Sequence, residues 1–174
     1  AQIYNHIIMP LASRADKITQ VKWGIEDFKS RFKREPEGIW LSETAVNIDT
    51  VRVLIDFGIK YIILAPTQAK KVRHLGGGNF SDVSNSNIDP RRPYLIYDYD
   101  NTRRIDDRSL AVFFYDGALS SAIGFQNLLT DSERFLSHIK GCYTRENHPQ
   151  LVSASTDGES YGHHTKFGDM CLAR

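Results

Sequence analysis

The chain has 174 residues, of which 41% are hydrophobic and 25% charged, and its formal net charge is +1. Length and composition fit one globular domain with a sizeable core. The nearly neutral charge gives no electrostatic reason to expect binding to nucleic acid or an anionic membrane, and no apolar run approaches the ~20 residues needed to span a bilayer.

The N-terminal part of the chain predicts a strand, a helix and a second strand. Residues 3–9, IYNHIIM, form an apolar run that is interrupted by His6 and closed by Pro10, and we expect a strand there. Residues 16–32 are the clearest helix, because their apolar side chains recur at spacings of three and four. The members of that apolar face are Ile18, Val21, Ile25, Phe28 and Phe32. Residues 38–41 predict a short buried strand.

The next segments predict a capped helix followed by a buried strand. Asn47 suits the N-cap of a helix that runs through Phe57, with Gly58 as its C-terminal stop. Its inward-facing residues are Val51, Leu54 and Ile55. Residues 60–65, KYIILA, are continuously apolar after the lysine, which predicts a strand buried on both faces, as in a parallel sheet.

Residues 74–108 contain a GGG run, two prolines and many Asn, Asp and Arg residues, and their periodicity is weak. We interpret this segment as a long excursion on one rim of the domain, with a short hairpin around residues 94–99. Structureless segments of such length are uncommon and tend to be functional. The excursion is therefore a candidate to lie over a site.

The C-terminal part predicts a strand and two helices. Residues 109–115, SLAVFFY, form the next buried strand, and residues 118–129 form a helix. Thr130 and Glu133 have the spacing of a capping box, so a further helix is expected to begin at Thr130 and to stop at Gly141. The two cysteines, Cys142 and Cys171, have no metal-like spacing and predict free thiols rather than a disulfide framework.

The last patterned stretch, residues 151–164 (LVSASTDGESYGHH), predicts a buried strand that ends in polar groups. Strands that alternate with helices must run parallel with right-handed crossovers. Acidic and amide side chains follow successive predicted strands: Glu43, Gln68, Asp116, Asp157 and Glu159. Parallel strands share an end, so these groups are expected to converge on one face, as in a barrel. No glycine-rich nucleotide motif follows any strand.

Two positions stand out as candidate catalytic acids. Glu43 follows Trp40 at the predicted mouth of a strand, although an acid there could instead stabilise the N-terminus of the next helix. Asp157 and Glu159 flank a glycine, and in an extended segment they would point the same way into one pocket. The alternative for this pair is an ordinary Asp-Gly turn.

The histidines and aromatic residues suggest contacts to a ligand rather than to a metal. His163 and His164 are adjacent and cannot share a helix face, so they make a poor chelating pair, and we expect one of them to contact substrate hydroxyls. His6 is either a satisfied interior histidine or a hydrogen-bond donor in the pocket. Trp40 and Tyr161 adjoin the acids and offer flat surfaces to a sugar ring, or else belong to the core.

Five segments in this order, YNHIIMPLA, GIWLSETAVN, ILAPTQA, FFYDG and TDGESYGHH, resemble glycoside hydrolase family 57. The closer resemblance is to the branch that carries the signatures W-L-x-E-T-A and T-D-G-E-S-Y-G-H-H. It covers nearly the whole chain. The family's first, histidine-rich motif has no counterpart here, and we expect the chain to be an internal piece of one catalytic domain that continues beyond residues 1 and 174.

The resemblance implies an α/β fold that is part of an incomplete (β/α)7 barrel, with parallel strands and helical crossovers. It implies a retaining enzyme that acts on α-glucans as an amylase, glucanotransferase or branching enzyme. Glu43 would be the nucleophile and Asp157 the acid/base. The candidate substrate-binding residues are His6, Trp40, Gln68, Asp116, Glu159, Tyr161 and His163.

No cofactor and no metal ligand are predicted. The expected partner is an oligo- or polysaccharide substrate, with no nucleic acid and no membrane, in a cytoplasmic protein. Two alternatives remain at this point. One is a metal-dependent polysaccharide deacetylase that would use Asp157 with His163 or His164 as ligands. The other is a carbohydrate-binding barrel that has lost catalysis.

Overall fold

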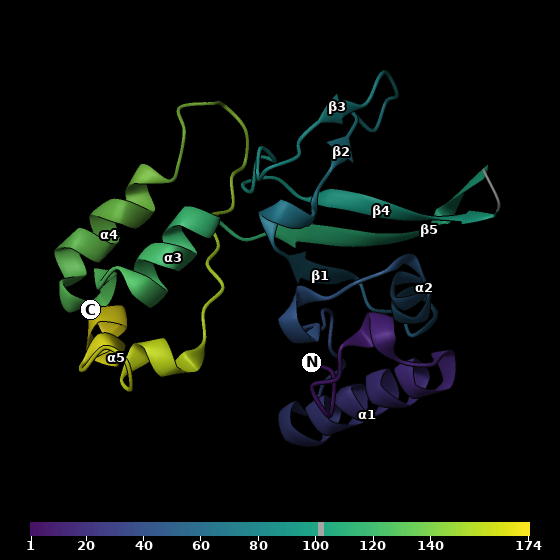
Figure 1. Ribbon diagram of the computed structural model, residues 1–174, viewed down its shortest axis with the longest axis horizontal. Coiled ribbons are helices and arrows are strands. Elements are labelled where there is room, and N and C mark those ends of the chain that lie inside the picture. Colours follow the sequence, from purple (N-terminus) through teal and green to yellow (C-terminus); the bar gives the residue numbers. More distant parts are fainter. Residues whose placement is uncertain (101–102) are drawn as a thin grey trace. The chain divides into compact units, whose positions relative to one another are not determined.

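The structure is a computed structural model that describes residues 1–100 and 103–174, and its ribbon is shown in Figure 1. The chain divides into two compact units. Unit 1 comprises Ala1–Leu64 and Pro93–Phe113, and unit 2 comprises Ala65–Arg92 and Phe114–Arg174. Residues 101 and 102 of the expected rim excursion lie outside the described residues. Among the described residues, no helix combines the length and apolarity that crossing a membrane requires.

Unit 1 begins with helix α1, Arg14–Phe32, which confirms the helix expected over residues 16–32. Ser13 caps its N-terminus by accepting a hydrogen bond from the Asp16 N–H. The expected inward face is only partly correct, because the fully buried residues lie on a shifted stripe: Lys17, Gln20, Val21 and Gly24. Ile18 and Phe32 of the expected face are 38% and 61% exposed.

The shift of this face has two visible causes. The backbone of Gln2 lies against Gly24, where an added Cβ would stand 2.0 Å from the Gln2 carbonyl oxygen. The ammonium of Lys17 lies 2.8 Å from the Asp49 carboxylate of helix α2. A close backbone contact and an ion pair with a buried lysine therefore accompany this shift of the buried face.

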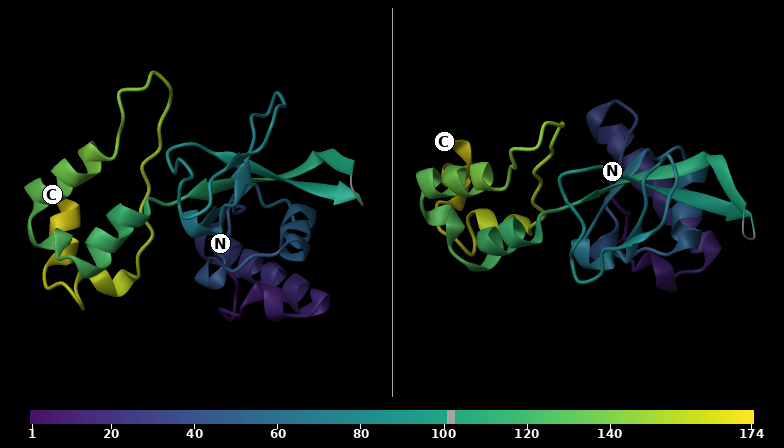
Figure 2. Two further views of the ribbon diagram at one scale, coloured as in Figure 1. Left: turned by 45° about the horizontal axis from the view of Figure 1, so that its top comes forward. Right: turned by 90° about the horizontal axis from the view of Figure 1, so that it is seen from above.

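Helix α2, Ile48–Asp56, has the predicted cap: the Asn47 side chain accepts from the Thr50 N–H at 2.9 Å. Gly58 follows with φ +72°, as expected of a glycine that ends a helix. Val51 and Leu54 are buried as predicted, whereas Ile55 is only half-buried. Helix α2 packs against both α1 and strand β4 (Figures 1 and 2).

The main sheet has the strand order β1-β5-β4, formed by β1, Tyr61–Leu64, β5, Arg103–Phe114, and β4, Tyr94–Asp100. Strands β4 and β5 are antiparallel. Two parallel bridges, Gln2 to Trp40 and Gly38 to Tyr61, bring the N-terminal segments alongside β1. The fold is thus a mixed α/β structure with parallel and antiparallel pairing. The expectation of uniformly parallel strands is wrong for the β4–β5 pair.

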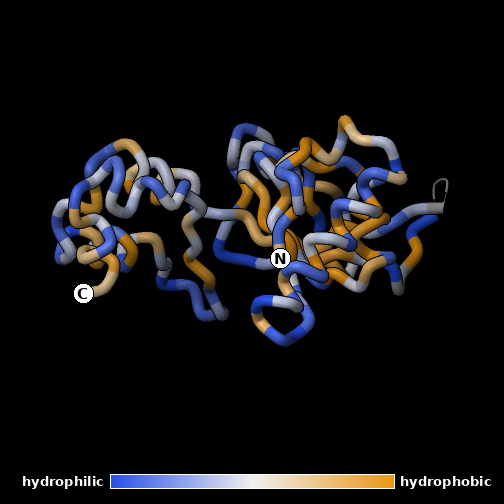
Figure 3. Tube along the Cα trace, turned by 90° about the horizontal axis from the view of Figure 1, so that it is seen from below, coloured by the Kyte–Doolittle hydropathy of each residue, from blue (hydrophilic) through white to orange (hydrophobic). Residues whose placement is uncertain are grey.

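Strand β5 begins at Arg103, six residues earlier than the expected strand over residues 109–115. The hairpin expected around residues 94–99 is present, but its first strand is β4 of the main sheet. Burial along β1 alternates, with Ile62 and Leu64 buried and Tyr61 36% exposed. The expectation of burial on both faces of residues 60–65 is therefore wrong. Hydrophobic and hydrophilic residues along the trace can be followed in Figure 3.

Three predicted strands do not form. Residues 38–41 make only the two isolated bridges of Gly38 and Trp40 and are not a regular strand. Within residues 3–9 the backbone turns after Ile3 and His6 adopts φ +54°, after which the short 3-10 helix η1, Met9–Leu11, begins. Residues 151–156 are not part of a strand either. They are held by single backbone bonds, from the Leu151 N–H to the Arg91 carbonyl and from the Asp116 N–H to the Ser153 carbonyl.

Unit 2 is mainly helical. Its helices are α3, Gly117–Phe125, α4, Ser132–Gly141, and α5, Gly168–Ala173, with the 3-10 turns η3, Pro66–Gln68, η4, Leu128–Thr130, and η5, Gly158–Tyr161. A small antiparallel pair, β2, Lys71–Val72, and β3, Ser81–Asp82, completes it. Its apolar core includes Leu119, Ile123, Leu128 and Leu129.

Two predictions for unit 2 need correction. The helix expected over residues 118–129 ends at Phe125, because Asn127 takes a left-handed conformation with φ +54°. Helix α4 is capped by the Asp131 side chain, which accepts from the Arg134 N–H, and not by Thr130. An aspartate is at least as good an N-cap as a threonine, so the capping box was assigned one residue early.

Candidate functional site

Glu43 stands on a strained turn, the 3-10 element η2, Ser42–Thr44, directly after the segment that pairs with the N-terminus. Glu43 and Thr44 have φ values of +55° and +54°, a region that non-glycine residues rarely adopt, β-branched threonine least of all. Such residues cost roughly 1–3 kcal/mol each and cluster at functional sites. The Glu43 side chain is 72% exposed, so the strained backbone leaves its carboxylate open to solvent.

His6 lies beside this carboxylate, with its Nε2 3.2 Å from Oε1 of Glu43. The parallel bridge between Gln2 and Trp40 explains the contact. The two segments run in the same direction from this bridge, so His6 and Glu43, which follow a few residues later, lie close together. His6 also has a left-handed φ of +54°. When its Nε2 carries a proton, the imidazole donates a hydrogen bond to Glu43 and can orient the carboxylate.

The residues before Glu43 are firmly held. Trp40 is half-buried, and its backbone N–H donates to the Ala1 carbonyl at 2.9 Å. Ser42 is 1% exposed, and its hydroxyl has no hydrogen-bond partner among the described residues. Helix α2 is capped by Asn47, not by Glu43, and the acid of its first turn is Asp49.

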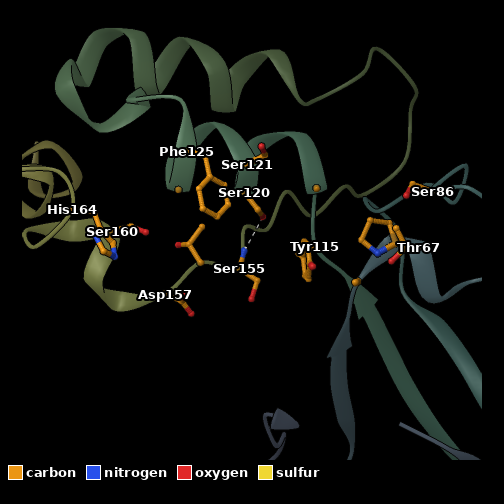
Figure 4. A pocket seen from close by; sticks show the side chains of 15 residues that line it. Thr67, Ser86, Tyr115, Ser120, Ser121, Phe125, Ser155, Asp157, Ser160 and His164 are labelled. Atoms are coloured by element: carbon orange, nitrogen blue, oxygen red, sulfur yellow. Dashed lines mark hydrogen bonds between the residues drawn. The ribbon is translucent and has the colours of Figure 1, made fainter. Parts of the chain in front are cut away.

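Unit 2 contains a pocket of about 330 Å³, within the size range of ligand sites (Figure 4). All its lining residues belong to unit 2. Most of its polar lining consists of hydroxyl groups, contributed by Thr67, Ser86, Tyr115, Ser120, Ser121, Ser155, Thr156 and Ser160. Asp157 is the acid among the lining residues. A wall rich in hydroxyls with one carboxylate suits a polyhydroxylated, uncharged ligand.

A chain of hydrogen bonds positions Asp157. The Ser155 N–H donates to Oγ of Ser120 at 3.0 Å, and that hydroxyl donates to the Asp116 carbonyl at 2.7 Å. The Asp116 N–H in turn donates to the Ser153 carbonyl at 2.8 Å. This clamp fastens residues 153–155 to the start of α3, so that Asp157 reaches the pocket at the N-terminus of η5. The side chain of Asp157 makes no capping bond and is exposed.

Asp157 and Glu159 do not lie on one extended segment, because η5 begins at Gly158. The expectation that these two side chains point the same way for that reason is therefore wrong. Glu159 is exposed, and its carbonyl accepts the backbone N–H groups of His163 and His164. The backbone of Glu159 thus stabilises the local turn.

Three other predicted residues have contacts that hold the fold. Oε1 of Gln68 accepts from the Ala65 N–H at 2.8 Å and closes η3. Oδ1 of Asp116 accepts from the Leu119 N–H at 2.9 Å and caps α3. The Tyr161 hydroxyl accepts from Oγ1 of Thr156 at 3.1 Å, while its ring packs on the helical core.

The histidine pair is arranged edge to face, with ring centroids 5.0 Å apart. His164 lines the pocket, whereas the candidate His163 is not among the lining residues. Sequence reasoning also missed Ser120, Ser155 and Phe125. The two serines are small polar residues outside any motif, and Phe125 falls within the helix predicted over residues 118–129, so local sequence carries no signal for them.

The ligands of the alternative metal-dependent deacetylase, Asp157 with His163 or His164, are not part of the metal-like cluster found among the described side chains. Among the side chains that the structure describes, the only group of three acids or histidines close enough to share an ion is Asp89, Glu146 and His148. Arg91 and Arg92 already pair with Asp89, and Arg92 and His148 pair with Glu146. We interpret this cluster as an ion-pair network that fastens residues 143–150 to residues 89–92.

The family model described as "Glycosyl hydrolase family 57" matches residues 1–171. None of the curated proteins matches the chain.

Several solved structures resemble the chain. A 4-alpha-glucanotransferase from Thermococcus litoralis is 17% identical over 94% of this chain and 22% of its own, with a TM-score of 0.61. A maltose-forming amylase from Pyrococcus sp. ST04 is 22% identical over 98% and 26%, with a TM-score of 0.66. A branching enzyme from Pyrococcus horikoshii is 16% identical over 99% and 39%, with a TM-score of 0.62. The chain therefore spans between 22% and 39% of these proteins.

Proposed function

The chain belongs to glycosyl hydrolase family 57, and on this premise we propose that it takes part in a retaining glycoside hydrolase or transglycosylase that acts on α-glucans. The observation that carries the proposal is the presentation of Glu43: an exposed carboxylate on a strained, left-handed turn, 3.2 Å from an imidazole nitrogen. Names of the similar structures, a glucanotransferase, an amylase and a branching enzyme, support the α-glucan as the substrate class.

In the first step of the proposed reaction, Glu43 attacks the anomeric carbon of one sugar. The bond from that carbon to the glycosidic oxygen breaks, and Asp157 gives its proton to the departing oxygen. In the second step water or a sugar hydroxyl attacks the glycosyl-enzyme, gives its proton to Asp157 and releases Glu43. The two inversions restore the original configuration. The mechanism requires the two carboxyl groups to come within about 5–5.5 Å.

His6 supports Glu43 in this scheme as a positioning residue, because a protonated Nε2 fixes the direction of the attacking oxygen. The hydroxyl-rich pocket supports Asp157 as the acid/base, because a sugar bound there is hydrogen-bonded close to the proton donor. The remaining candidates for substrate contacts, Trp40, Glu159 and His163, adjoin these two acids in sequence.

We also propose that the mixed sheet of unit 1 is part of an incomplete (β/α)7 barrel within a single catalytic domain. Parallel bridging of residues 2, 38, 40 and 61 supports this, since successive parallel neighbours are how such a barrel begins. Residues 74–108 would form the excursion on the rim of this barrel, apart from the β4 and β5 residues that enter the sheet.

The test is to replace each acid in the full-length protein by its amide and to measure turnover of maltoheptaose. Glu43→Gln removes the nucleophile and Asp157→Asn the proton donor, so each should lower kcat by at least about 10³-fold. Glu133→Gln, a matched change of an exposed acid on α4, should leave activity intact. Near wild-type turnover by either amide variant would overturn the assignment of that acid.

Added azide distinguishes the two roles. With an activated α-glycosyl donor, Asp157→Asn should form a glycosyl azide of α configuration, because azide, which needs no general base, attacks the β-linked glycosyl-enzyme in place of water and inverts the anomeric carbon a second time. Glu43→Gln offers no glycosyl-enzyme for azide to intercept, and it should give no such product. If Glu43→Gln forms this azide and Asp157→Asn does not, Glu43 is the acid/base and Asp157 the nucleophile.

A further inference from the structure

Phe125 is an aromatic side chain placed where folding alone does not require it. It is the last residue of α3 and is 88% exposed, whereas Leu119 and Ile123 of the same helix are 2% exposed. It lines the pocket that holds Asp157, and in Figure 4 its ring extends from α3 toward the segment that carries Ser155 and Asp157. An exposed ring of this size gains little from the apolar core and leaves a flat apolar surface open to a ligand in the pocket.

The surroundings of the ring match one face of a pyranose. A sugar has an apolar face of C–H groups, which packs on an aromatic ring, and an edge of hydroxyls, which need hydrogen-bond partners. Here the ring face lies in the same pocket as the hydroxyls of Ser121, Ser155 and Thr156. No arginine or lysine lines this pocket, which is built entirely from described residues, so an anionic ligand finds neither of these two counter-ions there.

We propose that this pocket holds the sugar on the leaving-group side of the bond that is broken, with Phe125 as its stacking wall. This inference rests on the proposed function. The sugar that is attacked must contact Glu43, and Glu43 does not line this pocket. The leaving-group sugar needs only the acid/base, and Asp157 lines a pocket whose walls all come from unit 2.

The test compares two substrates with different leaving groups. With maltoheptaose the leaving group is a sugar, which would occupy the Phe125 pocket. With α-maltotriosyl fluoride the C–F bond breaks, the bond from Glu43 to the anomeric carbon forms, and fluoride ion departs without using that pocket. Water then attacks the glycosyl-enzyme and gives its proton to Asp157. Both reactions are measured on the full-length protein.

Phe125→Ala should lower kcat/KM for maltoheptaose by about tenfold and leave kcat/KM for the fluoride within about twofold of wild type. Phe125→Trp keeps an aromatic face and should stay close to wild type on both substrates. Phe80→Ala is the matched control, since Phe80 is 57% exposed in the same unit and does not line the pocket. It should change neither value.

Equal kcat/KM of wild type and Phe125→Ala on maltoheptaose would overturn the inference while leaving the proposed function intact. Equal losses on both substrates would also overturn it, because they would place Phe125 on the side of the attacked sugar or in a purely structural role. A wild-type protein that releases neither fluoride nor sugar would overturn the proposed function itself.

Discussion

Asp98 of β4 offers a sharp test of what holds unit 1 together. It is 5% exposed and accepts hydrogen bonds from Nε of Arg52 at 2.8 Å and from Nε of Arg108 at 3.1 Å. Arg52 belongs to α2 and Arg108 to β5, so one buried carboxylate connects a helix to two strands. Asp98→Asn keeps the shape of the side chain and removes its charge.

The expected loss follows from these contacts. Hydrogen bonds to a charged group contribute about 1.5–3 kcal/mol each, and the neutral amide keeps only one acceptor. Both arginines retain another partner, Arg108 with Asp56 at 2.8 Å and Arg52 with the Tyr99 carbonyl at 3.0 Å. The free energy of unfolding should therefore fall by about 2–4 kcal/mol, somewhat less than for a buried pair with no alternative partner.

Urea unfolding followed by tryptophan fluorescence measures this loss, because both tryptophans, Trp23 and Trp40, lie in unit 1. Asp27→Asn is the matched control. Asp27 accepts from Nε of Arg31 on the surface of α1, with side chains that are 35% and 68% exposed. An exposed pair within one helix contributes less than about 1 kcal/mol.

The difference in the free energy of unfolding between wild type and Asp98→Asn should also depend on pH, which gives an independent check. The hydrogen bond from Arg52, with a second from Arg108, holds the pKa of Asp98 below its ordinary value. A depressed pKa in the folded state means that the stabilisation is complete above the unfolded pKa of about 3.9 and is lost as the pH falls through the folded pKa. The difference in the free energy of unfolding between wild type and Asp98→Asn should thus decrease by about 1 kcal/mol as the pH falls from 5 to 3. A gap under about 1 kcal/mol at pH 7, or one that does not narrow in acid, would refute the reasoning.

Two further changes test the packing of α1 and the clamp on Asp157. Gly24→Ala should destabilise the protein by about 1–3 kcal/mol in urea unfolding, despite the better helix propensity of alanine, because the new Cβ would meet the Gln2 carbonyl at 2.0 Å; Gly141→Ala, where a Cβ meets nothing within 4 Å, should be neutral or mildly stabilising. Ser120→Ala removes the acceptor of the Ser155 N–H and should lower kcat on maltoheptaose about tenfold or more; Ser121→Ala, whose hydroxyl accepts from Gln126 instead, should have a smaller effect, and equal effects would contradict the clamp.

Local signals in the sequence predicted the elements that are stabilised locally. The periodicity of residues 16–32 gave α1, and the Asn47 cap with Gly58 gave both ends of α2, because caps and helical repeats act over three or four residues. The strand predicted over residues 3–9 is absent because His6 adopts a left-handed backbone conformation, which an apolar pattern does not predict. The strand at 151–156 failed because an apolar run does not specify a neighbouring strand with which to pair.

For the candidate site, the five ordered motifs identified the family, and Glu43 and Asp157 remain predictions of the sequence as its catalytic acids. The strained turn under Glu43, its contact with His6, the clamp from Ser120 to Ser155 and the exposed ring of Phe125 came only from the structure. Each of these depends on residues distant in sequence that are brought together by the parallel bridge at Gln2 and Trp40 or by packing around α3. The sequence by itself determined which chemical groups are available and where the helices are capped. The tertiary structure decided which groups meet, because those contacts depend on the register of strands and the packing of helices, which no short stretch of sequence encodes.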